Sequence, residues 1–232
     1  MNKDAPRSFA ELSFYLIRAA TGAGLAPGLG EELAANAVYL ATHDIDPSPD
    51  CARLLQEAWD DQERVIPTIQ TTDKTVIYAT ADFSPLSAIT VAPIICDQII
   101  TDAHTKIFRS YLVQQPSQPM MFIAALARCT KVIGEIPITL RTLDNQMDVS
   151  LPQDLQGAAR IIQSDPDGIF EMEITRSGNS GEATTTDANL SGGIVTDSEA
   201  WRIICEFFHR SLVPSNAESR LAGAGAGLTD ND

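Results

Sequence analysis

Hydrophobic residues recur at helical spacing through the first quarter of the chain. After Ser8 the apolar residues return every three or four positions as far as Gly22, and Ser8 and Glu11 have the spacing of a capping box, which starts a helix. Similar apolar stripes follow a start near Glu31 and a Ser48-Pro49 start, and the second of them contains Leu54, Leu55, Ala58 and Trp59. The pattern predicts three short helices in a helical part that spans residues 8–64.

Beyond residue 73 the pattern changes to short runs rich in β-branched residues, which favour strands. We expect a helix at 97–113, and strands at 75–80, 88–96, 120–127, 131–139 and 146–150. Asp165-Pro166-Asp167-Gly168 combines a preset proline turn with a glycine that tolerates positive φ. The flanking segments, 158–163 and 169–175, are therefore predicted to form a β-hairpin, which completes a mainly β part at 74–175.

Two contrasting segments follow the predicted β part. Residues 176–193 hold hardly any large apolar side chain, so burial cannot offset the entropy lost on ordering, and we expect a mobile surface loop. Thr196 and Glu199 repeat the capping-box spacing before an apolar helical stripe that Pro214 ends. The sequence thus predicts one compact α+β unit over 1–232: an N-terminal helical part packed on a mixed or antiparallel sheet, then a C-terminal helix and tail at 196–232.

Charge and cysteine content narrow the function classes. The chain carries 16 Lys+Arg against 31 Asp+Glu, a net charge of −15, and no basic patch, which argues against a nucleic-acid partner. No apolar run approaches the roughly 18 residues that span a bilayer, and the N-terminus does not resemble a signal peptide. The four cysteines form no C-x-x-C pair. These features predict a cytoplasmic protein with reduced thiols and no membrane contact.

Few residues form a motif with known chemistry. The sequence lacks G-x-S-x-G, G-x-G-x-x-G after a strand and a P-loop lysine, and no cofactor can be assigned. His43-Asp44-Ile45-Asp46 offers nitrogen and oxygen atoms to a metal, but no paired-histidine spacing supports such a site. A solvated helix end is the favoured interpretation, so we predict no metal.

The Gly-rich C-terminal tail is the most unusual segment. The planar guanidinium of Arg220 could hold a carboxylate or phosphate, although a surface ion pair with Glu218 or Asp230 is the alternative. Backbone N–H groups of the glycines could bind an anion, whereas the terminal acids favour a cation. The catalytic candidates are Asp230 and Asp232, and the substrate-binding candidates are Ser219, Arg220, Gly223, Gly225, Gly227 and Asn231.

Two distinctive segments lie near the ends of the chain: Arg18-Ala19-Ala20-Thr21-Gly22-Ala23-Gly24-Leu25 and the ending from Ser219 to Asp232. Both resemble one uncharacterised bacterial family, known only as a domain of unknown function. The resemblance implies that the tail is a family feature, and it implies no activity, cofactor or catalytic residue.

Three hypotheses follow for the tail. In the leading one, the chain is a small-molecule catabolic enzyme, a hydrolase, lyase or isomerase, whose tail binds a polar substrate. In the second, it is a non-catalytic accessory subunit whose acidic tail inserts into a basic site of a partner enzyme. The partner could also be a second copy of the chain. In the third, the tail only packs over the sheet.

Overall fold

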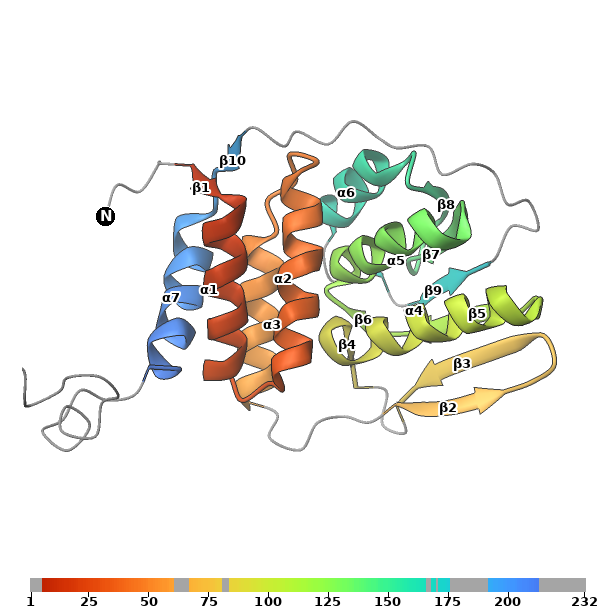
Figure 1. The fold of residues 1–232 in the computed structure, drawn as a ribbon. Coiled ribbons are helices and arrows are strands. Elements are labelled where there is room, and N and C mark those ends of the chain that lie inside the picture. The colour runs from red at the N-terminus through yellow and green to blue at the C-terminus, as the bar shows by residue number, and fades with distance from the viewer. Residues whose placement is uncertain are drawn as a thin grey trace, which may run out of the picture.

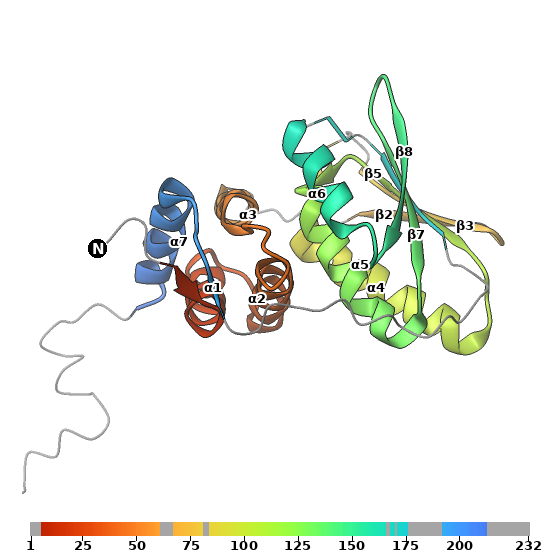
Figure 2. The same ribbon diagram turned by 90° about the horizontal axis from the view of Figure 1, so that it is seen from above.

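The computed structural model describes residues 6–60, 67–80, 84–165, 168–169, 171–175 and 192–212, and the structural statements below concern these residues. A group of four helices lies beside a second layer of three helices, which covers one face of a six-stranded mixed sheet (Figures 1 and 2). The predicted α+β class is therefore confirmed.

The helical group combines three helices from the start of the chain with one from near its end. Its members are α1 (Phe9–Gly22), α2 (Pro27–Ala41), α3 (Ser48–Asp60) and α7 (Ser198–Arg210). Beside the starts of α1 and α7, strand β1 (Arg7–Ser8) pairs antiparallel with β10 (Gly193–Ile194). Figure 1 shows α7 side by side with α1, so segments distant in sequence form one bundle.

Local side-chain chemistry sets the helix starts. The Ser8 hydroxyl accepts a hydrogen bond from the Glu11 N–H at 3.1 Å, as the capping-box pattern predicts. Helix α2 begins at Pro27, four residues before the expected start at Glu31, because proline is well suited to the first helical position. Helix α7 is capped by Asp197, one residue after the expected Thr196, and the Asp197 carboxylate accepts from two N–H groups of the first turn.

The six-stranded sheet has the order β2-β3-β5-β9-β7-β8. Strands β3 and β5 are parallel, and each other neighbouring pair is antiparallel. In chain order the strands are β2 (Thr68–Thr71), β3 (Thr75–Ala79), β5 (Ser110–Gln114), β7 (Ile136–Arg141), β8 (Gln146–Leu151) and β9 (Glu171–Ile174). A short parallel pair, β4 (Leu86–Ser87) and β6 (Pro116–Ser117), lies apart from this sheet.

Three helices connect the strands and cover one face of the sheet (Figure 2). Helix α4 (Ala88–Thr105) links β3 to its parallel neighbour β5 by way of β4. Helix α5 (Pro119–Ile133) links β6 to β7, and α6 (Leu155–Ser164) links β8 to β9. Parallel strands require such a crossover, so α4 is a consequence of the β3–β5 pairing.

Several strand predictions in the middle of the chain were wrong. Residues 88–96 and 120–127 belong to α4 and α5, and the expected hairpin is absent because 155–164 forms α6 while β9 pairs with β5 and β7. Residues 97–113 divide between the end of α4 and β5. The expected strands at 75–80 and 146–150 are confirmed, and β7 overlaps the one expected at 131–139.

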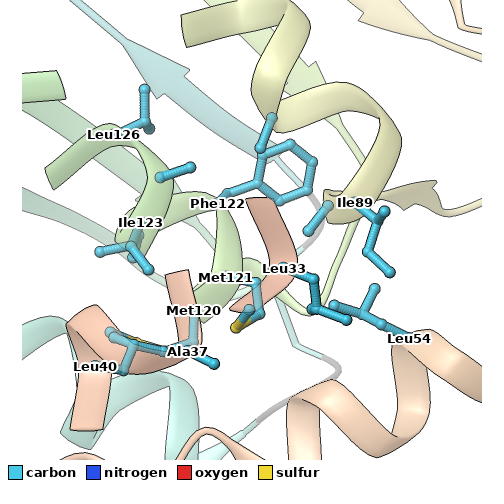
Figure 3. Packing of buried hydrophobic residues seen from close by; sticks show 14 of the residues in the cluster. Leu33, Ala37, Leu40, Leu54, Ile89, Met120, Met121, Phe122, Ile123 and Leu126 are labelled. Carbon is cyan, nitrogen blue, oxygen red and sulfur yellow. The ribbon is translucent and has the colours of Figure 1, made fainter. Parts of the chain in front are cut away.

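Burial on both sides explains the wrong assignments. Every residue of α5 from 119 to 127 is buried, so this helix shows no polar stripe and its sequence reads as a continuous apolar run. Figure 3 shows the cause: Leu33, Ala37 and Leu40 of α2 and Leu54 of α3 pack on one side of α5, near Met120 and Met121. The helical group therefore packs on the helices that cover the sheet.

The surroundings of Trp59 also differ from the prediction. Its side chain, expected in the buried stripe of α3, is 44% exposed. The Arg210 guanidinium lies 4.3 Å from the centre of its ring, and the Phe207 ring of α7 lies 6.2 Å away. Trp59 therefore joins the last turn of α3 to the last turn of α7.

Two further predictions concern the loop at 176–193 and the absence of membrane-spanning segments. Most of the loop predicted to be mobile, residues 176–191, lies outside the described residues. Within the part of the chain that the structure describes, no helix has both the length and the apolar composition that crossing a bilayer requires.

Candidate functional site

A carboxylate of α3 meets the polar segment that leads into α5. The two carboxylate oxygens of Glu57 each accept the Ser117 hydroxyl at 2.7 Å, and one of them lies 3.3 Å from the Gln118 side-chain amide nitrogen. Ser117 and Gln118 are buried, and Glu57 is half-buried. Glu57, Ser117 and Gln118 lie where the helical group meets the helix layer, and Asp50 lies on the same face of α3 as Glu57. We call these four residues the junction site.

The backbone of this segment is held in an unfavourable conformation. Gln115 and Gln118 have φ angles of 51° and 52°, in the left-handed region that costs a non-glycine residue about 1–2 kcal/mol. The fold imposes these angles: β6 lies between the two residues and pairs with β4, and the Leu86 N–H donates to the Gln115 carbonyl at 2.8 Å. Strained residues of this kind gather at functional sites, so the segment is a candidate on backbone geometry alone.

Helices α4 and α5 start side by side at this point. Ser87 pairs with Ser117 in the short parallel sheet, and each helix begins one or two residues later. Neither helix start receives a side-chain cap from its N-cap residue. The partial positive charge at the start of α5 therefore favours a carboxylate, and Glu57 supplies one.

Asp50 lies on the same face of α3 as Glu57, two helical turns earlier (57 − 50 = 7). The pKa of the half-buried Asp50 carboxyl is raised to about 6. Burial is the main cause, Arg53 lowers the pKa, and the negative charges of Asp46 and Glu57 raise it. A carboxyl group with a pKa near 6 can both release and take up a proton at neutral pH. Asp50 therefore has the acid–base properties of a catalytic group.

The raised pKa of Asp50 predicts a pH-dependent stability. The folded chain favours the protonated carboxyl, so the contribution of Asp50 to stability is full below its ordinary pKa of 3.8 and is lost as the pH rises through about 6. Relative to Asp50→Asn, the natural chain should lose up to about 3 kcal/mol between pH 4 and pH 7. Urea unfolding of both proteins at these two pH values measures the loss. Parallel pH dependence would show that the pKa of Asp50 is ordinary.

Asp46 joins two helix starts. One carboxylate oxygen accepts the Ser48 N–H at 2.9 Å, and the other accepts the Ser48 hydroxyl at 3.0 Å and the Asp197 N–H at 2.8 Å. The Asp197 N–H also lies 3.1 Å from the Ser48 hydroxyl oxygen. These contacts fix the start of α3, and so the position of Asp50, against the start of α7.

In the cluster from His43 to Asp46, two of the side chains that could bind a metal make hydrogen bonds within the protein. The Nδ1 atom of His43 lies 2.8 Å from the Tyr39 carbonyl oxygen, and Asp46 is occupied as described above. Among the residues that the structure describes, no group of three His, Cys, Asp or Glu side chains is placed to hold a metal ion.

The predicted catalytic and substrate-binding residues, from Ser219 to Asp232, all lie outside the described residues.

The sequence did not predict the junction site. Two signals point to it: the polar segment 114–118 with Pro116, and the seven-residue spacing of Asp50 and Glu57 on one helix.

Comparison with known proteins gives the fold and no family. No family model and no curated protein matches the chain, and the resemblance of its two ends to an uncharacterised family stays a prediction. A solved structure from E. coli, described as a putative malate/lactate dehydrogenase, has 10% identity and a TM-score of 0.54, with 94% of this chain and 98% of that chain covered.

Two malate dehydrogenases have lower TM-scores. The enzyme from Pyrococcus horikoshii OT3 has 11% identity and a TM-score of 0.46, with 65% of this chain and 51% of that chain covered. The enzyme from Entamoeba histolytica has 9% identity and a TM-score of 0.41, with 60% and 39% covered. The chain thus spans about half the length of the Pyrococcus protein. With the E. coli structure it shares a fold, and at such identity the likeness extends no further.

Proposed function

We propose that this chain is a cytoplasmic enzyme that transfers a proton to or from a polar small molecule at the junction site. One observation carries the proposal: a carboxyl group, Asp50, has a pKa of about 6 and lies on the helix face that meets the strained turn before α5. A hydrolase, lyase or isomerase each needs such an acid–base group. Perturbed carboxyl groups gather at catalytic sites.

The other junction residues suit supporting roles. Glu57 is held by Ser117 and Gln118, and this arrangement fixes its carboxylate beside the start of α5. Because Glu57 already accepts these hydrogen bonds, Asp50 is the better candidate for proton transfer. Glu57 then acts on Asp50 through its negative charge, which raises the pKa of Asp50.

The charge of the site indicates the substrate class. Asp50 and Glu57 place two carboxyl groups on one face of α3, Asp46 adds a third just before the helix begins, and Arg53 is the basic residue among them. Such a surface repels anions and attracts neutral or cationic polar groups. A polyol, an amine or an amino sugar therefore fits the site better than a dicarboxylate does.

The tail can reach the junction site. The cation–π contact of Arg210 with Trp59 places the end of α7 at the end of α3. The eight residue-to-residue steps from Leu212 to Arg220 (220 − 212 = 8) span at most about 28 Å when extended. Asp50 lies about 15 Å along α3 from Asp60, so Arg220 and the terminal acids are within reach of a substrate there. In this proposal the tail binds the substrate and Asp50 transfers the proton.

A thermal-shift screen of the full-length chain tests the proposal. The panel contains polyols, amines and amino sugars, together with 2-hydroxy and 2-oxo acids because of the name of the E. coli neighbour. We expect a neutral or cationic compound to raise the melting temperature of the natural chain and of Asp60→Asn, an exposed carboxylate on the same helix. The shift should fall sharply in Asp50→Asn and in a chain that ends at Ala222.

Two outcomes would contradict the proposal. One is an equal shift in the natural chain and in Asp50→Asn, which would place binding elsewhere. The other is no shift with any compound, combined with salt-sensitive binding of a partner protein that requires residues 223–232. The net charge of −15 favours that second result, and it would replace the enzyme with the accessory-subunit hypothesis.

A further inference from the structure

Two cysteine side chains meet between the helices that cover the sheet. Helices α4 and α5 leave the paired residues Ser87 and Ser117 in the same direction (Figure 1). Cys96 is the ninth residue of α4 counted from Ala88, and Cys129 is the eleventh of α5 counted from Pro119. With a rise of about 1.5 Å per residue the two positions differ by only about 3 Å in height. Each thiol shifts the pKa of the other, and both lie near the charges of Arg128 and Glu32.

The surroundings make the two thiols unequal. The interaction with Cys96, aided by the positive charge of Arg128, lowers the pKa of Cys129. The same interaction and burial raise the pKa of Cys96. Arg128 is itself fixed, because its guanidinium donates to Glu32 at 2.8 Å and to Asn36 at 2.6 Å, both on α2. Cys129 is therefore the better nucleophile and Cys96 its neighbouring thiol.

The other two cysteines lack these features. Cys51 is fully buried, and burial raises its pKa well above the ordinary value. Cys205 is half-buried and thus more accessible than Cys96 or Cys129, each 9% exposed, but burial raises its pKa also. If exposure alone governed oxidation, Cys205 would react first. If pairing governs it, Cys129 reacts first.

We propose that Cys96 and Cys129 form an oxidation site at which a hydroperoxide converts the thiol pair into an intramolecular disulfide. The Cys129 thiolate attacks one peroxide oxygen and the O–O bond breaks, which gives a sulfenic acid and, for hydrogen peroxide, one water after proton uptake. The Cys96 sulfur then attacks the Cys129 sulfur, the S–S bond forms, and the sulfenic oxygen leaves as a second water. Two thiols lose two electrons in total, and the peroxide gains them.

The disulfide would join α4 to α5 about 12–15 Å along the helices from their starts at Ala88 and Pro119. It would fix the two helices relative to each other. It would also close a loop of 33 positions (129 − 96 = 33), which restricts the unfolded chain. Oxidation should therefore raise the melting temperature by several degrees.

The test treats the reduced full-length chain with a small molar excess of hydrogen peroxide. Differential alkylation followed by peptide mass spectrometry measures each cysteine over time. We expect a Cys96–Cys129 disulfide, with the loss of two hydrogen atoms, while Cys51 and Cys205 remain thiols. The cross-link should revert with dithiothreitol. Oxidation of Cys205 at the same rate or faster, or oxidation of Cys129 without a cross-link, would overturn the proposal.

Single variants separate the two roles. In Cys96→Ser the Cys129 sulfenic acid should persist and react with dimedone, because its resolving thiol is missing. In Cys129→Ser the remaining Cys96 should stay reduced under the same conditions. Equal dimedone labelling of the two variants would show that the thiols are equivalent. If the remaining cysteine stays a thiol in both variants, the pair is not an oxidation site. Cys205→Ser is the matched control, and it should form the disulfide at the natural rate.

Discussion

Replacing Gly22 by alanine is expected to lower the free energy of unfolding by about 3 kcal/mol or more, and so to leave little folded protein on mild heating. Gly22 lies in the last turn of α1, against the end of α7. A Cβ atom added there would lie 1.8 Å from the Phe207 carbonyl oxygen, 2.8 Å from its carbonyl carbon and 3.2 Å from the Ser211 nitrogen. These are backbone atoms, which cannot turn away as the end of a side chain can.

Gly28→Ala is the matched control, because it adds the same methyl group to a helix of the same bundle. A Cβ atom at Gly28 would meet no heavy atom within 4 Å, and alanine favours a helix over glycine by up to about 1 kcal/mol. Urea unfolding should therefore show a less stable Gly22→Ala and an unchanged or slightly more stable Gly28→Ala. Equal stability of the two variants would mean that α7 does not pack this closely on α1.

A second large effect is expected at the junction site. Once the screen provides a substrate, Asp50→Asn should lower turnover by about 10²–10⁴-fold, the usual contribution of a positioned acid–base group. Asparagine keeps the shape of aspartate but cannot carry the proton. The folded structure should persist, because Asn is uncharged and avoids the cost of burying a charge that raises the pKa of Asp50.

The pH profile separates catalysis from indirect damage. In the natural chain the rate should change around pH 6, where the Asp50 carboxyl titrates, and this inflection should be absent from the residual rate of Asp50→Asn. Asp60→Asn, exposed at the end of the same helix, should keep both the rate and the inflection. A natural-type inflection in Asp50→Asn would assign the proton transfer to another group.

Local side-chain signals predicted the helical part well. The Ser8–Glu11 spacing predicted the start of α1 correctly, because a local hydrogen bond from the Glu11 N–H to the Ser8 hydroxyl caps the helix. The middle of the chain was harder. Helix α5 is covered on one side by the sheet and on the other by α2, so its apolar run loses the period that distinguishes a helix from a buried strand.

The candidate site could not be assembled from sequence because it depends on distant segments. Glu57 and Ser117 are 60 positions apart, and the sequence does not show that α3 lies across the start of α5. The raised pKa of Asp50 depends mainly on its burial in the folded chain, which the sequence does not show. The tail, by contrast, has an unusual composition within a single stretch, and its residues from Ser219 to Asp232 remain candidates.

Because the helical group combines α1, α2 and α3 with α7, it is completed only late in synthesis. A ribosome completes α1, α2, α3 and the whole sheet before it makes α7. Until then α7 does not cover the Tyr15 ring, which stacks on Phe208 at 4.5 Å in the finished protein, or the α1 backbone at Gly22. A nascent chain stalled before residue 198 should therefore bind chaperones at this face, and release of α7 should end that binding.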